Sequence, residues 1–189
     1  MPVATRVAPA PKLDIERIVA AAFAMLDDEG LDGLSMRSLA ARLGVQAPAL
    51  YWHFTSKNAL LSVMARRVYA GARPQGNDTG SWRNWLTDFG TALHTVFTEQ
   101  RDRAQLCAVA RPAGDQAGEE LGDVIAAPLV ARGLDRDQAL SRQASIIAFT
   151  LGWALYETNG PMLARLSSML DVSAAYRDGL EAMVRGFPD

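Results

Sequence analysis

Side chains that can hydrogen-bond to phosphate oxygens or to nucleobase edges gather in one short stretch of this chain, residues 37–57. Arg37 can reach a guanine edge or a phosphate, and the Tyr51 hydroxyl and the His53 imidazole can both hydrogen-bond to phosphates. Lys57 falls in the expected first turn of a helix, where its ammonium and the free backbone N–H groups both favour a phosphate. The chemistry that this set offers is recognition of a polyanion.

Smaller and aromatic residues complete the set: Ala47, Ala49 and Trp52 fall on or beside the same expected surface. An alanine methyl can contact the methyl group of thymine. Each residue alone also has an ordinary structural explanation, since a Tyr-Trp-His run often packs against a core and a single lysine is often a solvated charge. The combination within one stretch favours a surface that reads DNA.

The spacing of residues 35–53 predicts the element that positions this set, a helix-turn-helix. Leu39 and Leu43 place two apolar anchors on one face of a first helix, and Gly44 permits a positive φ at a sharp turn. Leu50 closes the small core from the second helix. Such a unit can project its second helix into a major groove roughly 12 Å wide. The same apolar pattern occurs in other helical hairpins, so it indicates DNA binding only together with the polar set.

The fold class expected from the pattern is all-α, because apolar residues recur at helical spacing and no alternating strand pattern of useful length is present. An N-terminal three-helix helix-turn-helix head is expected to join a larger C-terminal helical core. Asp14, Ser35, Ser56 and Ser81 are expected helix N-caps, and Gly30 is an expected helix end. In the core, a first helix is expected to begin at Ser81. Further helices are expected at about 102–110, 115–131, 136–158 and 172–186.

The charge of the chain is divided between these two parts. Residues 1–73 carry nine Lys or Arg and six Asp or Glu, whereas residues 74–189 carry ten and fifteen, so the parts have net charges of +3 and −5. The pI of about 5.7 averages a basic head with an acidic core and does not argue against nucleic acid. We expect a DNA-binding domain at 1–73 and a ligand-binding and dimerisation domain at 74–189. The arm 1–12 is either disordered or a further DNA contact.

Composition weighs against membrane proteins, secreted proteins and enzymes. No apolar run approaches the roughly 20 residues of a membrane span, and the first residues lack the apolar segment of a secretory signal, so we expect a cytoplasmic protein with no membrane partner. The chain has one cysteine, Cys107, and two histidines. These supply no nucleophile with a base and no metal cluster, so no catalysis, metal or cofactor is expected. A small helical enzyme or ligand carrier, or a helical interaction module, remain the alternatives.

A family resemblance covers residues 13–68. This stretch resembles the DNA-binding domain of the TetR family of bacterial transcriptional regulators. The residues that carry the resemblance are the run from Gly30 to Arg37, Leu39-Ala40, Leu43-Gly44-Val45, Pro48 to Phe54, Lys57 and Leu60-Leu61. The Leu-Tyr-Trp-His run is similar to the tetracycline-repressor branch in particular. The resemblance implies a homodimer formed through about 136–158 and 172–186, a small effector that releases a palindromic operator, and operator contacts by Arg37, Ala47, Pro48, Ala49, Tyr51, Trp52, His53 and Lys57. That branch has a glutamine and a threonine where this chain has Ala47 and Ala49, which implies a different operator.

The effector expected for the core is hydrophobic or aromatic. Trp85, Phe89, Leu93 and Phe97 share one helical stripe, Phe149 and Trp153 lie on another, and Cys107, Arg111 or His94 are candidate polar anchors. Each of these residues could equally be ordinary core.

The magnesium chemistry of the tetracycline-repressor branch is not expected here. The resemblance places Cys107 and Tyr156 where that branch has a metal-binding histidine and a glutamate. Neither suits magnesium, and Glu157 is turned about 100° away on a helix.

Overall fold

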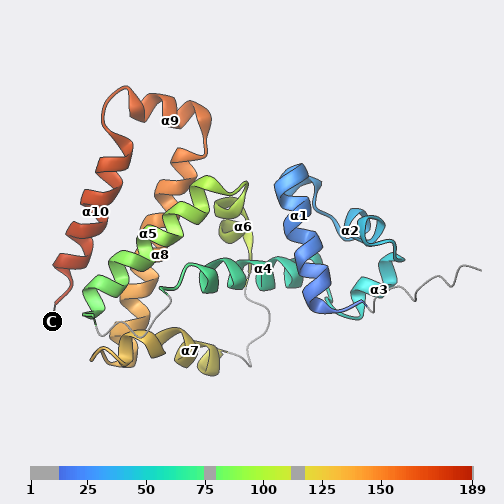
Figure 1. The fold of residues 1–189 in the computed structure, drawn as a ribbon, viewed down its shortest axis with the longest axis horizontal. Helices are drawn as coiled ribbons and strands as arrows, with labels where there is room; N and C mark the ends of the chain where they lie inside the picture. Colours follow the sequence, from blue (N-terminus) through green and yellow to red (C-terminus); the bar gives the residue numbers. More distant parts are fainter. Residues whose placement is uncertain (1–12, 75–79, 112–117, 189) are drawn as a thin grey trace, which may run out of the picture.

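The computed structural model describes residues 13–74, 80–111 and 118–188, and in these ranges all regular structure is helical (Figure 1). The all-α expectation is confirmed. The arm 1–12 lies outside the described residues, as do 75–79 at the expected domain boundary and the first residues of the helix expected at 115–131.

The head is built from the long helix α1 (Ile15–Gly33) and two short ones, α2 (Met36–Leu43) and α3 (Ala47–Tyr51). The expected caps are present, because the Asp14 carboxylate accepts a hydrogen bond from the backbone N–H of Arg17 at 2.8 Å and Ser35 forms a reciprocal capping box with Ser38. Gly30 has φ +80° and breaks the regular geometry of α1 three residues before its end. Local cap chemistry therefore sets where these helices begin and bend.

The turn between α2 and α3 depends on Gly44, which adopts a left-handed conformation with φ +69°. Its N–H and that of Val45 donate to carbonyls at the end of α2, at 3.1 Å and 3.0 Å respectively. A residue with a Cβ would be strained at this φ. The turn directs Leu50 of α3 inward, where its side chain is fully buried together with Leu39 of α2.

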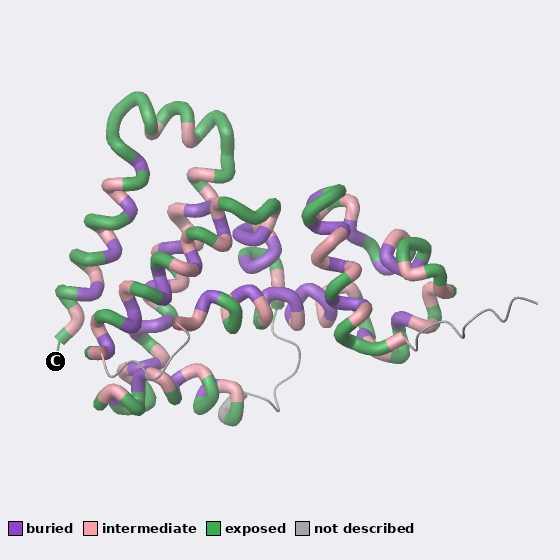
Figure 2. Tube along the Cα trace, viewed as in Figure 1, coloured by how far each residue is buried: buried purple, intermediate pink, exposed green. Residues whose placement is uncertain are grey.

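Helix α4 (Lys57–Gly71) runs from the head into the rest of the molecule (Figure 1). Ser56 caps it, and Leu60 and Met64 are buried in the middle of its length. Figure 2 shows buried residues along most of this helix. One rigid element is thus common to the head and to the core.

In the described residues, the core is formed by α5 (Trp82–Glu99), α6 (Arg103–Val109), α7 (Gly118–Val130), α8 (Arg136–Glu157), α9 (Gly160–Ser167) and α10 (Val172–Gly186). Helix α5 packs against both α8 and α10. Gly90 allows the close approach, because a Cβ there would lie 2.8 Å from Leu180 and 3.1 Å from Ile146. The Tyr176 hydroxyl, which is paired with Thr150 at 3.1 Å, donates to the Gly90 carbonyl at 2.8 Å. Packing and hydrogen bonding together fix these three helices.

Helix α9 was not expected from the sequence. None of its residues is buried, and its trace is green along nearly its whole length in Figure 2. Asn159 caps it and Pro161 stands in its first turn. Among the helices formed by the described residues, none is both long enough and apolar enough to cross a membrane.

Candidate functional site

The polar set expected to read DNA lies at the exposed end of the head. Trp52 is 90% exposed and Tyr51 is 50% exposed, while Arg37 and Pro48 are also exposed. The remaining members are partly buried: Ala47, Ala49, His53 and Lys57. We call these eight residues the reading face. A tryptophan left almost wholly in water is a costly feature for a single chain and is typical of a binding surface.

The inward side of the same segment explains why the reading face points outward. Leu50 and Phe54 are buried, and the N–H of Phe54 donates to the Leu50 carbonyl at 2.9 Å. These two anchors hold one side of α3 and the following turn against the head core. The side chains of Tyr51 and Trp52 therefore face solvent.

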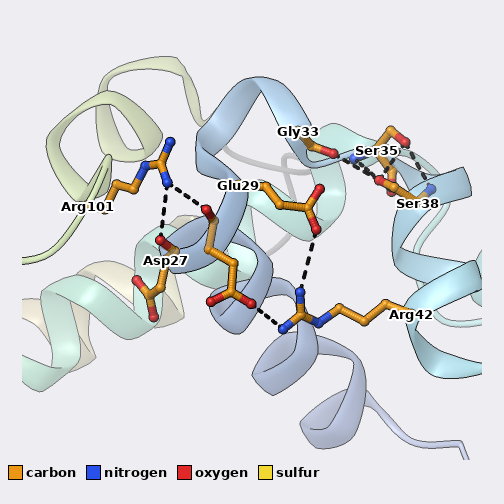
Figure 3. A network of polar contacts seen from close by, with 8 residues as sticks. Asp27, Glu29, Gly33, Ser35, Ser38, Arg42 and Arg101 are labelled. Atoms are coloured by element: carbon orange, nitrogen blue, oxygen red, sulfur yellow. Dashed lines mark hydrogen bonds and ion pairs between the residues drawn. The ribbon is translucent and has the colours of Figure 1, made fainter.

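Arginines of the head divide into paired and unpaired groups. Arg42 of α2 pairs with Asp28 and Glu29 near the end of α1, and Figure 3 shows its contact with Glu29, so its charge serves the fold of the head. Arg37 and Lys57 form no ion pair with any residue that the structure describes. Their positive charges remain available to phosphates.

Gln46 is a candidate base-reading residue that the sequence analysis missed. It occupies the N-cap position of α3, is exposed, and makes no capping hydrogen bond with its side chain. A free amide in this place can donate to and accept from an adenine edge. The signal was available in the sequence, since Gln46 directly precedes the second helix of the motif.

A cavity of about 550 Å³ lies in the core between α4, α5, α7 and α8. We call it the α4–α8 cavity. Most of its wall is apolar, with Phe89 from α5, Leu121 and Val124 from α7, and Ile147 and Leu151 from α8. Its volume falls in the range of roughly 300–1,000 Å³ that holds a drug-sized molecule.

The polar groups of this wall come from α4, from the residues just after it and from α8: Arg66, Tyr69, Arg73 and Gln143. None of the four was singled out from the sequence. Their convergence depends on how α4, α7 and α8 pack, which no local spacing encodes. A glutamine next to the long apolar part of α8 was the one available signal.

One of the residues expected to bind an effector, Phe89, lines the α4–α8 cavity. Trp85 stacks on Phe89 at 5.2 Å between ring centroids, and Leu93 and Phe97 are fully buried in the core. Phe149 and Trp153 pack against Tyr176 of α10. Arg111 is exposed, and its carbonyl accepts a hydrogen bond from the Asn58 amide at 3.4 Å. The structure therefore does not gather this set around one cavity.

Cys107, the other expected anchor, is buried on α6. Burial raises the pKa of its thiol to about 11, against weaker lowering by the Tyr69 hydroxyl and by the charge of Arg103. Burial also raises the pKa of the Tyr69 phenol, with a smaller contribution from Cys107. Both groups are neutral near pH 7, and the thiol is a packed side chain rather than a reactive one.

A cluster at the start of α6 holds the head against the core. The Asp102 carboxylate accepts a hydrogen bond from the Leu31 N–H at 2.8 Å, beside the break in α1. Arg101 donates to the Asp28 carbonyl at 2.7 Å, and Figure 3 shows it reaching across to the end of α1. Arg103, which is 5% exposed, pairs with Asp27 at 2.8 Å. We call Arg101, Asp102 and Arg103 the α6 latch.

Comparison with known proteins identifies the family. The family model described as bacterial regulatory proteins, tetR family, matches residues 18–64, which contain the whole reading face. The tetracycline repressor protein class A from transposon 1721 of Escherichia coli is 32% identical over 199 aligned residues, covering 93% of this chain and 90% of that one. The chain belongs to the TetR family of bacterial transcriptional regulators.

Solved structures agree with this membership in the TetR family. The class A tetracycline repressor in complex with 5a,6-anhydrotetracycline and magnesium is 32% identical, with a TM-score of 0.66 over 92% of this chain and 97% of that one. BioQ with its double-stranded DNA operator is 29% identical, with a TM-score of 0.68 over 93% and 98%. As a TetR-family member, the chain is a DNA-binding regulator and not an enzyme.

The residues of this TetR-family chain do not fit a magnesium site of the tetracycline-repressor kind. The position expected to hold a metal-binding histidine has Cys107, whose raised pKa keeps a proton on the sulfur. The position of the glutamate has Tyr156, a phenol that is 52% exposed. Glu157 instead bonds to the His94 Nε2 at 2.9 Å. Magnesium prefers carboxylates and water, so no step of the function is assigned to it.

Proposed function

We propose that this chain is a homodimeric repressor that binds a palindromic operator through two reading faces and releases it when a small apolar effector enters the α4–α8 cavity. The observation that carries the DNA-binding part is the 90% exposure of Trp52 beside unpaired Arg37 and Lys57. Buried in a DNA interface, this tryptophan would lose the unfavourable contact with water that it has in the free chain.

Each member of the reading face has a role that follows from its chemistry. Arg37 and Lys57 contact phosphates or a guanine edge, and the Tyr51 hydroxyl positions the helix on the backbone. Ala47 and Ala49 have no side chain that can hydrogen-bond to a base, so Gln46 reads a base edge instead. Two such heads must lie about 34–36 Å apart to enter successive turns of the major groove.

Helix α4 supports the coupling of effector to operator. Its middle is buried with the head core at Leu60 and Met64, while Tyr69 and Arg73 near its end line the α4–α8 cavity. The helix has 15 residues. At 1.5 Å per residue it spans about 22 Å, so a small rotation at the cavity becomes a displacement of the head. An effector that binds the displaced arrangement more tightly must weaken operator binding by the same factor.

The expected effector residues other than Phe89 have a supporting part in this proposal. Trp85, Leu93, Phe97 and Cys107 are buried, and three of them contact wall residues: Trp85 stacks on Phe89, and Phe97 and Cys107 contact Tyr69. Phe149 and Trp153 pack beside α10, on the side that we assign to the dimer. A tetracycline carried by magnesium is not the proposed effector, because Cys107 and Tyr156 do not supply its ligands.

Footprinting of the DNA that flanks the gene, followed by affinity measurements on the protected site, tests the DNA-binding part. Arg37→Ala and Tyr51→Ala should each weaken operator binding by roughly tenfold, the effect of about 1–3 kcal/mol per specific contact. Arg165→Ala, which removes an exposed charge on α9, outside the reading face and the proposed dimer helices, is the matched control and should leave the affinity unchanged. Unchanged affinity in both reading-face variants would contradict the proposal.

A further inference from the structure

All charged residues that line the α4–α8 cavity among the described residues have the same sign. Arg66 and Arg73 contribute two positive charges, and no described aspartate or glutamate is part of the wall. Arg66 lies on α4 and Arg73 follows two residues after the end of this helix, and both side chains line the cavity. The cavity therefore presents a positive edge to whatever enters it.

Arg66 is not engaged by any other residue that the structure describes. It is exposed and forms no hydrogen bond or ion pair with any described residue. The neighbouring Arg67 differs, because it pairs with Glu16 of α1. A guanidinium at the edge of an apolar cavity, with its five N–H groups uncommitted, is suited to bind a planar anion with two parallel hydrogen bonds.

Arg73 lies nearer the apolar wall. It donates to the Val124 carbonyl at 3.4 Å, and burial lowers the pKa of its guanidinium. A guanidinium keeps its proton in proteins, so a partly buried one gains stability when an anion approaches. Arg73 thus adds a second attraction for negative charge.

Gln143 supplies an independent sign of a ligand. Its side chain is 2% exposed, lines the cavity, and has neither a donor nor an acceptor for its amide among the described residues. An unpaired buried amide is costly, by roughly 1–3 kcal/mol per group. The rest of the nearby wall is apolar, so the partner that would satisfy this amide is a polar atom of a bound molecule.

We propose, on the basis of the function proposed above, that the effector is an organic carboxylate: an apolar body of drug size with one carboxylate group. The carboxylate lies between Arg66 and Arg73, the apolar body lies against Phe89, Ile147 and Leu151, and the Gln143 amide bonds a polar atom of that body. This is a different ligand class from a metal-carried drug, because charge recognition comes from arginine and needs no metal.

Sets of compounds with the same body and different head groups test this class. The probes are 1-naphthaleneacetate, 1-naphthaleneacetamide and 1-naphthylethylamine, with decanoate, decanamide and decylamine as a second body. Calorimetry on the full chain should show the carboxylate of at least one body binding ten or more times as tightly as its amide, with the amine binding weakest.

Substitutions test whether Arg66 and Gln143 cause the preference for a carboxylate over an amide. Arg66→Gln should lower carboxylate affinity about tenfold and leave amide affinity unchanged, and it keeps the fold because Arg66 is exposed and unpaired. Gln143→Leu should weaken both the carboxylate and the amide, since the Gln143 amide bonds the body that both share. Arg185→Gln, far along α10, is the matched control and should change neither.

The outcomes separate this inference from the repressor function. If amides or amines bind as tightly as carboxylates, if Arg66→Gln has no effect, or if no compound of either body binds, the carboxylate proposal is overturned even where operator binding is sound. If carboxylates bind selectively but never alter operator affinity, the ligand class is correct and the effector-release function is wrong. Carboxylate-dependent release of the operator supports both.

Discussion

Cys107 shows how burial decides the chemistry of a single residue. The thiol is 8% exposed, and burial raises its pKa to about 11. At pH 8 a thiol with this pKa is about one part in a thousand thiolate, compared with about one part in four for a free cysteine with a pKa near 8.5. We expect iodoacetamide to label the folded chain more than about 100-fold more slowly than the urea-unfolded chain at pH 8.

The pH dependence of Cys107 has a definite sign. Because the folded pKa lies above the ordinary value of 9.0, the neutral thiol stabilises the fold below about pH 9, and this contribution is lost as the pH rises toward 11. Labelling followed by mass spectrometry at pH 8 and pH 10 measures the effect on the thiol. Equal labelling rates for folded and unfolded chains at pH 8 would show that Cys107 is a reactive, accessible thiol.

Residue types in the sequence indicated the reading face more completely than the cavity. Helical spacing placed Trp85, Phe89, Leu93 and Phe97 on one stripe, and all four are buried. A stripe does not reveal which member borders empty space, because that depends on helices distant in sequence. Only Phe89 of this stripe lines the cavity among the described residues.

At the scale of helices, the α6 latch holds α1 of the head against the core. Asp102 has φ +54°, a left-handed conformation that non-glycine residues seldom adopt, and its carboxylate binds the Leu31 N–H where α1 breaks. The strained backbone is held at the point where head and core meet. We infer that the latch keeps α1 in place when α4 rotates.

Asp102→Ala should destabilise the chain by roughly 1–3 kcal/mol, because the Leu31 N–H loses its acceptor. Asp102→Asn is the matched control, since asparagine tolerates the left-handed conformation and keeps an acceptor oxygen, and it should cost about 1 kcal/mol or less. Urea unfolding measures both values, and hydrogen exchange at Leu31 should quicken in the alanine variant only. Equal stability of the two variants would show that the carboxylate bond contributes nothing.

Helix boundaries followed from local chemistry wherever a cap side chain or a glycine defined them. Ser35, Gly44 and Ser81 all act as expected. Helix α9 escaped notice because it has no buried stripe, although Asn159 followed by Pro161 is a start signal independent of periodicity. Periodicity finds helices that pack within the chain, whereas caps also find those that do not.

At the scale of the whole molecule, the division of charge matters more than the total. The head carries +3 and the core −5, so the chain presents a basic face to DNA although its net charge is −2. The division is read directly from the sequence, and the reading face that the sequence predicts stays a prediction. The sequence predicted an apolar effector pocket in the core but, apart from Phe89, not the residues that line it, because the lining is a property of how four helices assemble.

The proposed dimer depends on an outward face of α8 that one chain leaves open. Ala144, Ala148, Gly152 and Tyr156 follow one another at spacings of four residues, so they form one stripe along the helix, whose first two members also border the α4–α8 cavity. Tyr156 is 52% exposed, and a Cβ added at Gly152 would meet nothing within 4 Å. A stripe of small residues followed by an exposed aromatic ring allows a second helix to approach closely. A second copy of this chain supplies that helix.

Gly152→Arg should therefore separate the dimer without harming the fold of each subunit, because the added side chain has room within one chain and none against a partner helix. Analytical ultracentrifugation should give twice the 20.4 kDa of one chain for the unmodified protein and a single chain mass for the variant. Operator affinity should fall by about 100-fold or more, since each isolated head then binds one half-site without the effective concentration that the partner provides. Gly71→Arg at the end of α4, where a Cβ also meets nothing within 4 Å, is the matched control and should remain dimeric. A Gly152→Arg protein that keeps the doubled mass would place the dimer contact on another surface.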